Sequence, residues 1–342
     1  MTTIRGKLKV GTEVEANRSC SPGISIVIPC HNDGEYLTRS AKSVLEQEAN
    51  GLPGFELLII DDGSEDANTQ SILQEISLLD DRVRILHRKT AGGVASARNY
   101  GVENAVGTWV AFLDADDEWL PTALQDRWAL VARYPDAEWI GADHVLFWDN
   151  GEMEDEGFLA SRERPRQCLK EAFEKGQPVV LKRPVVEFLE TMPAWTGTVF
   201  VKKSVFELVG GFDSHFKQAE DNHLWLRLAA YTDYIFLPKV IARYRQRNGS
   251  LTSTSDSSYF WDYKMLLDLK KQAQFSDYKS NIRQRILSDL KNDVWFQRGI
   301  KKWSKALRSS LIACCVAPLR PKSYRLFLST FLAGMTKMFH GT

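Results

Sequence analysis

Between residues 24 and 113, four short apolar runs alternate with segments of helical periodicity. Polar residues follow three of these runs. Runs of this length predict buried strands, and the periodic segments predict amphipathic helices. Strands that alternate with helices favour an α/β fold built on a parallel sheet with right-handed crossovers. The predicted strands are 24–28, 55–60, 83–86 and 109–113, and the predicted helices are 36–45, 72–79 and 93–105.

Three of these strands end in polar residues. The segments are Cys30-His31-Asn32, Asp61-Asp62-Gly63-Ser64 and Asp114-Ala115-Asp116-Asp117. Pro29 is expected to stop the first strand because proline cannot donate to a sheet ladder. Ligands of open α/β sheets bind beyond the carboxyl ends of the strands. Three polar ends on that edge favour a ligand site over chance.

The third segment places three carboxylates within four positions. Carboxylates this close repel one another and favour a shared cation. Asp is a hard oxygen donor, so Mg²⁺ or Mn²⁺ is expected rather than Zn²⁺. The alternative is a solvated acidic turn in which Asp117 caps a helix that starts near Leu120.

The second half of the chain is less regular. Gly210-Gly211 is expected to end a short helix, and another helix is expected to begin near Glu220. The residues from 150 to 174 are charged and expected to be exposed, and those from 245 to 258 are expected to form a loop. Further strands are predicted at 139–148, 198–201, 234–237 and 241–244.

Charge is distributed unevenly along the 342 residues, although the whole chain is neutral. Residues 258–342 contain 16 Lys and Arg but 5 Asp and Glu. An acidic body with a basic tail suggests an anionic surface as partner. The tail also carries two apolar stripes, which either pack on the body or lie on an anionic membrane. These stripes are Phe296, Ile300, Trp303 and Leu307, then Tyr324, Phe327, Leu328, Phe331, Leu332, Met335 and Phe339.

The composition, 44% hydrophobic and 26% charged, is that of a soluble globular protein. Five cysteines without CxxC spacing favour a reducing, cytoplasmic compartment over a disulfide framework or zinc site. Residues 1–22 are expected to form a flexible arm and lack the apolar core of a signal peptide. No apolar run has the length that a bilayer-spanning helix needs.

Several ordered motifs resemble those of family 2 glycosyltransferases over residues 22 to 252. They are Ile26-Val-Ile-Pro-Cys-His-Asn32, Asp61-Asp-Gly-Ser64, Ala97-Arg-Asn-Tyr-Gly101, Phe112-Leu-Asp-Ala-Asp-Asp117, Gly210-Gly-Phe-Asp213, Glu220-Asp221 and Tyr244-Arg245. The resemblance implies a GT-A fold, with a mostly parallel sheet flanked by helices. It also implies a nucleotide-diphosphate sugar donor, a divalent cation (Mn²⁺ or Mg²⁺) and inversion at the anomeric carbon.

The same resemblance implies roles for individual residues. Asp221 would be the general base with Glu220 as its substitute, Asp116 a metal ligand, and Asp114 a contact of the ribose or the metal. Trp195 would stack on an acceptor sugar. The residues implied to bind the donor are Pro29, His31, Asn32, Glu35, Asp61, Asp62, Arg98, Asp114, Arg245 and Arg247.

Structural alternatives stay open for most of these residues. Glu220 and Asp221 could be favourable first-turn charges of a helix, and Trp195 could be core packing. Arg98 binds phosphate as a planar fork, but it could equally pair with a site aspartate. Asp61-Asp62 could form a tight turn in which Ser64 caps the next helix.

Three segments are therefore expected: a flexible arm (1–22), a GT-A domain (23–257, divided near 118 into nucleotide and acceptor halves) and a basic amphipathic helical tail (258–342). The expected activity is transfer of a sugar, from a UDP-sugar by preference, to a saccharide or lipid-linked glycan in cell-surface polysaccharide or glycoconjugate biosynthesis. No nucleic-acid partner is expected. The rivals are a non-catalytic sugar- or membrane-binding scaffold and another nucleotide-dependent enzyme, such as a nucleotidyltransferase; no GxGxxG follows the first strand.

Overall fold

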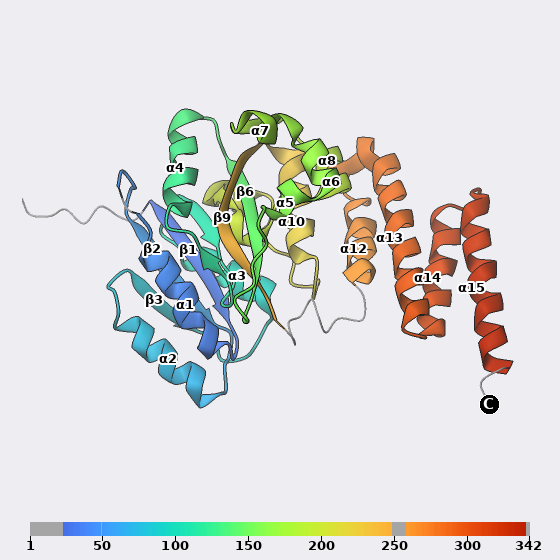
Figure 1. The fold of residues 1–342 in the computed structure, drawn as a ribbon, viewed down its shortest axis with the longest axis horizontal. Coiled ribbons are helices and arrows are strands. Elements are labelled where there is room, and N and C mark those ends of the chain that lie inside the picture. Colours follow the sequence, from blue (N-terminus) through green and yellow to red (C-terminus); the bar gives the residue numbers. More distant parts are fainter. Residues whose placement is uncertain (1–22, 49, 248–257, 340–342) are drawn as a thin grey trace, which may run out of the picture.

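The computed structural model describes residues 23–48, 50–247 and 258–339 (Figure 1). The predicted arm 1–22 and most of the predicted loop 245–258 lie outside the described residues. Strands and helices alternate through the first part of the chain, as predicted. These elements are β1 (Ile24–Cys30), α1 (Gly34–Leu45), β2 (Phe55–Asp61), α2 (Ala67–Ser77), β3 (Val83–His87), α3 (Val94–Asn104) and β4 (Trp109–Phe112).

The strands of the described residues form one sheet in the order β3-β2-β1-β4-β8-β6-β9-β5, with β7 paired to β9. Strands β3, β2, β1 and β4 are parallel, while β8 is antiparallel to both β4 and β6. This mixed α/β sheet confirms the predicted fold class. The later elements are β5 (Glu118–Trp119), α4 (Ala123–Arg133), β6 (Trp139–Trp148), α5 (Phe158–Ser161), α6 (Glu163–Cys168), α7 (Lys170–Lys175), β7 (Val179–Leu181), α8 (Val185–Thr191), β8 (Phe200–Lys202), α9 (Lys203–Leu208), α10 (Glu220–Tyr231) and β9 (Tyr234–Gln246).

Pro29, which was expected to end a strand, and Pro238, which follows the strand predicted at 234–237, both lie inside strands. Pro29 sits in the central strand β1, which pairs with β2 through Cys30 but with β4 only as far as Val27. The missing N–H of Pro29 faces the β4 side, where the pairing has already ended, so no ladder hydrogen bond is lost. Pro238 lies within β9 at a register shift against β6, between the partners of Ala142 and Asp143. The two strands predicted at 234–237 and 241–244 are therefore one.

The segment from 150 to 174 is not the exposed stretch predicted from its charge. It contains the short helices α5, α6 and α7, and three of its apolar side chains are buried. These are Leu159, Leu169 and Ala172, which belong to the core on one face of the sheet. The prediction of exposure followed the many charged residues of this segment and missed the three apolar residues that are buried.

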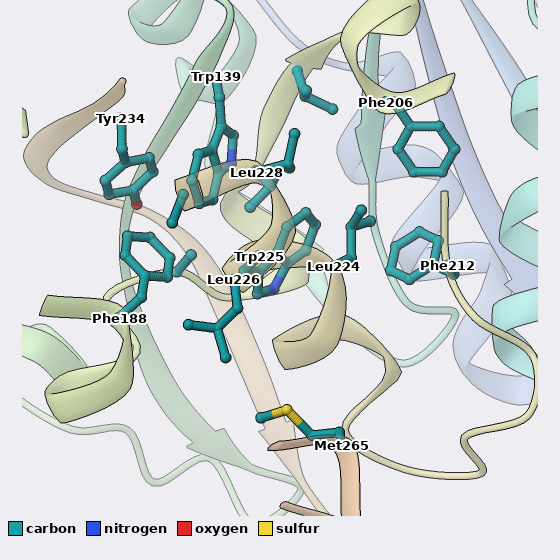
Figure 2. Close-up of a cluster of buried hydrophobic side chains, with 14 of the residues drawn as sticks. Trp139, Phe188, Phe206, Phe212, Leu224, Trp225, Leu226, Leu228, Tyr234 and Met265 are labelled. Carbon is teal, nitrogen blue, oxygen red and sulfur yellow. The ribbon is translucent and has the colours of Figure 1, made fainter. Parts of the chain in front are cut away.

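Side chains of β1 alternate between two cores on opposite faces of the sheet. Ile26 and Ile28 pack with residues of α1, α2 and α4. Val27 packs into the other core, which contains residues of α3, α8 and α10. Figure 2 shows the centre of this second core, where Trp139 and Trp225 stack with ring centroids 6.1 Å apart. Truncation of a fully buried Trp to Ala typically costs about 3–5 kcal/mol, so this contact is central to stability.

Four helices follow the sheet: α12 (Ser258–Leu269), α13 (Lys279–Gly299), α14 (Trp303–Val316) and α15 (Pro321–Phe339). Met265 of α12 reaches the core of the sheet domain (Figure 2), as does Ile286 of α13. Helices α14 and α15 stack outward from α13, so α15 lies farthest from the sheet (Figure 1). Helices α12 and α13 of the tail therefore pack on the body, through residues that belong to neither of the two predicted stripes.

The predicted stripe from Phe296 to Leu307 is wrong as a single helical face. Helix α13 ends at Gly299 and α14 begins at Trp303, with Lys301 in a left-handed conformation between them. The stripe therefore crosses a helix boundary. Among the described helices, none is both long enough and apolar enough to cross a bilayer.

Candidate active site

The carboxyl ends of β1, β2 and β4 meet at one edge of the sheet. Strand β1 lies between the other two, with Cys30 opposite Asp61 and Val27 opposite Phe112. The three polar segments that follow these strands therefore share this edge, as the sequence predicted. Open α/β sheets bind their ligands at such an edge.

Asp61 is buried at the end of β2. Its Oδ1 accepts the backbone N–H of Ser64 at 2.9 Å. Its Oδ2 lies 2.9 Å from Nδ1 of His87 and 3.3 Å from Nε2 of Gln70. Burial by itself would raise the pKa of Asp61, but the hydrogen bonds from these three residues outweigh burial and lower the pKa. The charged carboxylate holds the turn after β2 in place.

Asp62 is also buried and fixes the loop that follows β3. Its carboxylate accepts the backbone N–H groups of Gly92 at 3.0 Å and Gly93 at 2.8 Å. It also pairs with Nη1 of Arg88 at 2.5 Å. The tight-turn alternative for Asp61 and Asp62 is therefore present in the structure, and their contact with a nucleotide base stays a prediction.

The cap of α2 is Asp66 rather than Ser64. Asp66 accepts the backbone N–H of Thr69 at 2.7 Å. Ser64 instead accepts the backbone N–H of Asn32 at 3.0 Å, and Oδ1 of Asn32 accepts the N–H of Glu65 at 3.0 Å. Asn32 has a left-handed backbone (φ 59°), which Asn tolerates better than most residues. This predicted donor residue ties the ends of β1 and β2 together.

Three other predicted donor residues lie around the end of β1. Pro29 is buried, whereas His31 and Glu35 are exposed. Nδ1 of His31 lies 3.0 Å from the carbonyl oxygen of Asp62, so its ring borders the same edge of the sheet. Pro29 can therefore support a ligand site only from within the sheet, while His31 and Glu35 are accessible to a ligand.

The turn after β4 holds the two predicted metal ligands against arginines from other elements. Oδ1 of Asp114 accepts from Nη2 of Arg98 at 2.6 Å. Oδ2 of Asp116 accepts from Nε of Arg247 at 2.7 Å. Burial raises the pKa of Asp116, and the charge of Asp114 adds to this effect. The arginines offset the repulsion that neighbouring carboxylates create.

Asp117 is a completely buried support of this turn, and its predicted role as a helix cap is wrong. Strand β5 (Glu118–Trp119) follows it, and α4 begins only at Ala123 after the cap residue Thr122. Oδ1 of Asp117 accepts the backbone N–H of Arg245 at 2.8 Å, which joins the turn to β9. Its buried Oδ2 accepts no hydrogen bond from the described residues.

Arg245 was predicted to bind the donor, but its guanidinium faces the protein interior. The side chain is 1% exposed and pairs with Glu118 at 2.8 Å and Asp149 at 2.7 Å. Its Nε donates to the carbonyl oxygen of Asp116 at 2.7 Å. These contacts make Arg245 a support behind the turn, so the donor role is not retained for it.

Arg98 was also predicted to bind the donor, with an aspartate pair as the alternative. The structure shows the pair: Nη2 binds Asp114 and Nη1 binds Glu220 at 2.9 Å, and the side chain is 4% exposed. Burial would lower the pKa of Arg98, but the two carboxylates outweigh it and raise the pKa. Arg98 therefore joins the turn after β4 to the start of α10 instead of presenting a free fork to phosphate.

Arg247 is more accessible than the other two arginines. It contacts Asp116 and also donates from Nη2 to Asp33 at 2.9 Å. Its side chain is 26% exposed. Arg247 is therefore paired with Asp116, the carboxylate that was predicted to bind the metal. A donor-binding role for Arg247 stays a prediction.

Asp221 lies in the first turn of α10, directly after Glu220. Its Oδ1 accepts the backbone N–H of Asn222 at 2.7 Å, and its Oδ2 lies 3.4 Å from the hydroxyl of Thr196. Burial raises the pKa of Asp221, although the charge of Arg98 opposes this. Burial, and then the charge of Asp221, also raise the pKa of Glu220. Within the part of the chain that the structure describes, no Lys or Arg forms an ion pair with Asp221.

Trp195 lies one residue before Thr196 and is partly buried. Its ring packs 4.5 Å from the ring of His144 and 5.2 Å from that of Tyr244. The core-packing alternative is therefore present. Trp195 is only partly buried and precedes Thr196, which contacts Asp221. Stacking of Trp195 on an acceptor sugar stays a prediction.

The carboxylates of the turn after β4 fit a hard divalent cation, but only in part. Oδ2 of Asp114 accepts no hydrogen bond from the described residues, and all the donor atoms are oxygens. No group of three or more His, Cys, Asp or Glu side chains in the described ranges is arranged to hold a metal. Mg²⁺ is commonly held by one or two carboxylates together with substrate phosphates and water. Asp114 and Asp116 fit that division of ligands.

Sequence reasoning missed three contributors to the site. Asp33 shares Arg247 with Asp116, Thr196 contacts the predicted base, and Glu118 shares Arg245. Each contact joins residues that are at least 25 positions apart in the sequence. The fold brings them together, so local sequence patterns carried little signal. Asp33 follows the polar segment after β1, and that position was the one available indication.

The central part of this chain matches a known family. Residues 25–177 match the model of Glycosyl transferase family 2. The chain is 38% identical over 106 residues to the putative teichuronic acid biosynthesis glycosyltransferase TuaG of Bacillus subtilis, covering 31% of this chain and 40% of TuaG. It is 38% identical over 110 residues to the UDP-Glc:alpha-D-GlcNAc-diphosphoundecaprenol beta-1,3-glucosyltransferase WfgD of Escherichia coli, covering 32% of this chain and 41% of WfgD. The matched part thus spans less than half of each of these relatives.

Solved structures resemble the chain over nearly its whole length. The crystal structure of S. aureus TarS 1-349 in complex with UDP-GlcNAc has a TM-score of 0.60 at 14% identity, and covers 93% of this chain and 92% of that one. The mannosyltransferase PcManGT from Pyrobaculum calidifontis, in complex with GDP-Man and Mn²⁺, has a TM-score of 0.58 at 14% identity, covering 95% and 89%. At this identity the likeness concerns the fold, and it confirms the GT-A prediction.

Proposed function

Because residues 25–177 match the model of Glycosyl transferase family 2, we propose that this chain transfers a sugar from a nucleotide-diphosphate sugar to a hydroxyl group, with inversion. One observation carries the proposal: of the carboxylates gathered in this site, Asp114, Asp116 and Glu220 each contact an arginine, and Asp221 does not among the described residues. Asp221 instead contacts a hydroxyl and a backbone N–H. Asp114 and Asp116 suit a cation, and Asp221 suits a proton.

Asp221 is the proposed general base. It takes the proton of the acceptor hydroxyl while that oxygen attacks the anomeric carbon. The bond from the anomeric carbon to the diphosphate breaks, and the nucleoside diphosphate leaves with the bonding electrons. The raised pKa of Asp221 supports this role, because a stronger base accepts a proton more readily. The single displacement inverts the anomeric configuration.

Asp116 and Asp114 are the proposed ligands of Mn²⁺ or Mg²⁺. A bound cation would stabilise the charge that develops on the leaving diphosphate. Arg247 would have to release Asp116 for this, and its guanidinium would then be available to the diphosphate. The Mn²⁺ named with PcManGT supports a cation, and the UDP-GlcNAc named with TarS supports a UDP-sugar as donor.

A lipid-linked glycan is the proposed acceptor, in the biosynthesis of a cell-surface polysaccharide. The name of WfgD, which acts on a diphosphoundecaprenol-linked sugar, supports this class of acceptor. We place the reaction in the cytoplasm. The described cysteines Cys30, Cys168, Cys314 and Cys315 are all free, the state that a reducing compartment maintains.

The test is release of nucleoside diphosphate from a panel of UDP-, GDP- and dTDP-sugars, with Mn²⁺ and with a chelator. We expect release from one class of donor, dependent on the cation and stimulated by a saccharide acceptor. Asp116→Ala should abolish the metal-dependent part of nucleotide binding in calorimetry. Binding of the donor without release from any of them, across an acceptor panel, would favour a sugar-binding scaffold over an enzyme.

A further inference from the structure

Helix α15 buries small and hydroxyl-bearing residues against the protein and exposes five of its large apolar side chains. Ser323 and Thr330 are buried, and Gly334 lies against the ring of Trp303 in α14. The opposite face carries a stripe of five large apolar side chains that are 40–61% exposed. This α15 stripe consists of Tyr324, Leu328, Phe331, Leu332 and Met335.

The α15 stripe reverses the usual arrangement of a surface helix. Such a helix normally buries its apolar face against the core and exposes its polar face. The five residues recur at spacings of three and four, so they form one continuous row along the helix. Helix α15 is the last of the stacked helices, and its inner face packs mainly on α14 and also contacts α13 (Figure 1). A contiguous exposed row of this kind indicates a surface that meets another apolar phase.

The charge around this stripe is entirely positive. Residues 294–339, which include α14 and α15, contain nine Lys and Arg and no Asp or Glu. Arg325 is three positions before Leu328 and exposed, at one edge of the α15 stripe. The acidic residues of the tail lie nearer the sheet domain, where Asp289 and Asp293 are buried. The outer half of the tail therefore combines an apolar row with a net positive charge.

We infer that α15 lies on an anionic lipid surface, with the α15 stripe in the acyl boundary and the basic side chains at the headgroups. A second copy of this chain would bring the same positive charges against each other, so self-association through this face is disfavoured. Nucleic acid would satisfy the charges but leave a leucine-rich row uncovered. An anionic lipid surface satisfies both features at once. The helix is 19 residues long, or about 28 Å, and would lie in the plane of the surface.

The inference does not depend on the sugar transfer proposed above. It does place the enzyme where a lipid-linked acceptor would be found. Failure of lipid binding would overturn the proposed lipid surface and leave the transfer reaction untouched. Release of the nucleoside diphosphate from the donor, measured with a water-soluble acceptor, reports on the transfer reaction alone.

The test is flotation of the full chain with phosphatidylcholine vesicles, with and without phosphatidylglycerol. We expect binding to the anionic vesicles, weak binding to the neutral ones, and loss of binding as salt is raised. Leu328→Ser with Leu332→Ser should weaken binding by about tenfold or more, because each side chain loses its transfer into an apolar phase. Lys322→Ser with Arg325→Ser should remove much of the preference for anionic lipid.

The matched control is Leu78→Ser at the residue that follows α2, a leucine that is 87% exposed but lies away from the tail. It should bind vesicles as the unaltered chain does. Nucleotide binding and the unfolding temperature should be the same in all these variants, because every altered side chain is exposed. Three results would each overturn the inference. They are equal binding to neutral and anionic vesicles, unchanged binding of the double leucine variant, and a dimer of the unaltered chain that becomes monomeric in this variant.

Discussion

The two acidic groups of the site differ in how their carboxylates meet positive charge. In the turn after β4, Asp114 contacts Arg98 and Asp116 contacts Arg247. At the start of α10, Asp221 contacts only a hydroxyl and a backbone N–H among the described residues. Both groups lie at the same edge of the molecule, and Arg98 joins them through the residue next to Asp221.

This difference separates two kinds of carboxylate chemistry. An arginine fixes a carboxylate in position and offsets its charge, which suits a ligand for a cation. Asp221 has no arginine on its carboxylate among the described residues, and its raised pKa lets it take a proton. The α10 group should therefore control the rate of transfer, and the group after β4 should control metal and donor binding and the stability of the site.

Replacement of the unpaired carboxylate should have the largest effect. Asp221→Asn removes the proton acceptor but preserves size and the hydrogen bond to Thr196. We expect the turnover rate to fall by about 10²–10⁴-fold, the typical contribution of a general base. Donor affinity, measured by calorimetry with Mn²⁺, should be unchanged.

The matched control is Asp268→Asn on α12, which removes a carboxylate from the other side of α10, where Asp268 lies 3.3 Å from His223. Its turnover should stay close to that of the unaltered enzyme. Turnover retained in Asp221→Asn would assign the base to another group and remove the functional contrast between the two acidic groups.

Loss of the arginine that joins the two groups should be the next largest effect. Arg98→Met leaves Glu220 without its cationic partner in the interior, and also frees Asp114. Breaking a buried ion pair from one side costs about 3–5 kcal/mol. Urea unfolding at neutral pH should show a loss of this size.

An arginine on the surface provides the comparison for this measurement. Arg39 lies in α1 and is exposed, so Arg39→Met should change stability by no more than about 0.5 kcal/mol. Equal stability of Arg98→Met and Arg39→Met would mean that the two acidic groups are independent of each other.

The pairing of Arg98 also shows where prediction from sequence ended. The alternation of apolar runs and helical segments was enough to place Asp61, Asp114 and Asp116 at one edge, because parallel strands end together. It could not show that Arg98 pairs with Glu220, which lies 122 positions away. The resemblance assigned Arg98 to the donor, with a pair to a site aspartate as the alternative, and a buried charge first needs such a protein partner.

The errors in the fold have a similar origin. Pro29 was taken as a strand end, and the strand predicted at 234–237 ended before Pro238. Pro29 lies where the pairing with β4 has already ended, so no hydrogen bond from its nitrogen is needed. Pro238 lies at a register shift between β9 and β6. Whether a proline ends a strand depends on the pairing of the strand next to it, which the local sequence does not contain. For the same reason, the exposed α15 stripe could be recognised as a stripe but not assigned to core or surface.

The pH dependence of transfer should follow the unpaired carboxylate. Burial raises the pKa of Asp221 above the ordinary value of 3.8. The base acts when deprotonated, so kcat/KM should fall as the pH falls through this raised pKa, by about tenfold for each further pH unit. The acidic limb should therefore lie at higher pH than for an ordinary aspartate. A flat profile across this range, in an enzyme that stays folded by circular dichroism, would contradict the assignment of Asp221.

The smallest expected effect concerns the arginine that occupies the predicted metal ligand. Arg247 contacts Asp116 at 2.7 Å and is partly exposed, so the pair is worth at most about 1 kcal/mol. A divalent cation has to displace the guanidinium before it can bind this carboxylate. Without donor present, Arg247→Ala should therefore bind Mn²⁺ up to about fivefold more tightly in calorimetry.

Strand β9, which ends one residue before Arg247, provides a control for this measurement, because Arg243 pairs with Glu118 at 3.5 Å and has no contact with Asp116 among the described residues. Arg243→Ala should leave the affinity for Mn²⁺ unchanged. If Arg247→Ala also loses affinity for the nucleotide sugar when Mn²⁺ is saturating, the guanidinium passes from the carboxylate to the diphosphate as the donor binds. Unaltered affinity for Mn²⁺ in Arg247→Ala would mean that this arginine does not compete for Asp116, and that pairing with arginine is not what distinguishes the turn after β4.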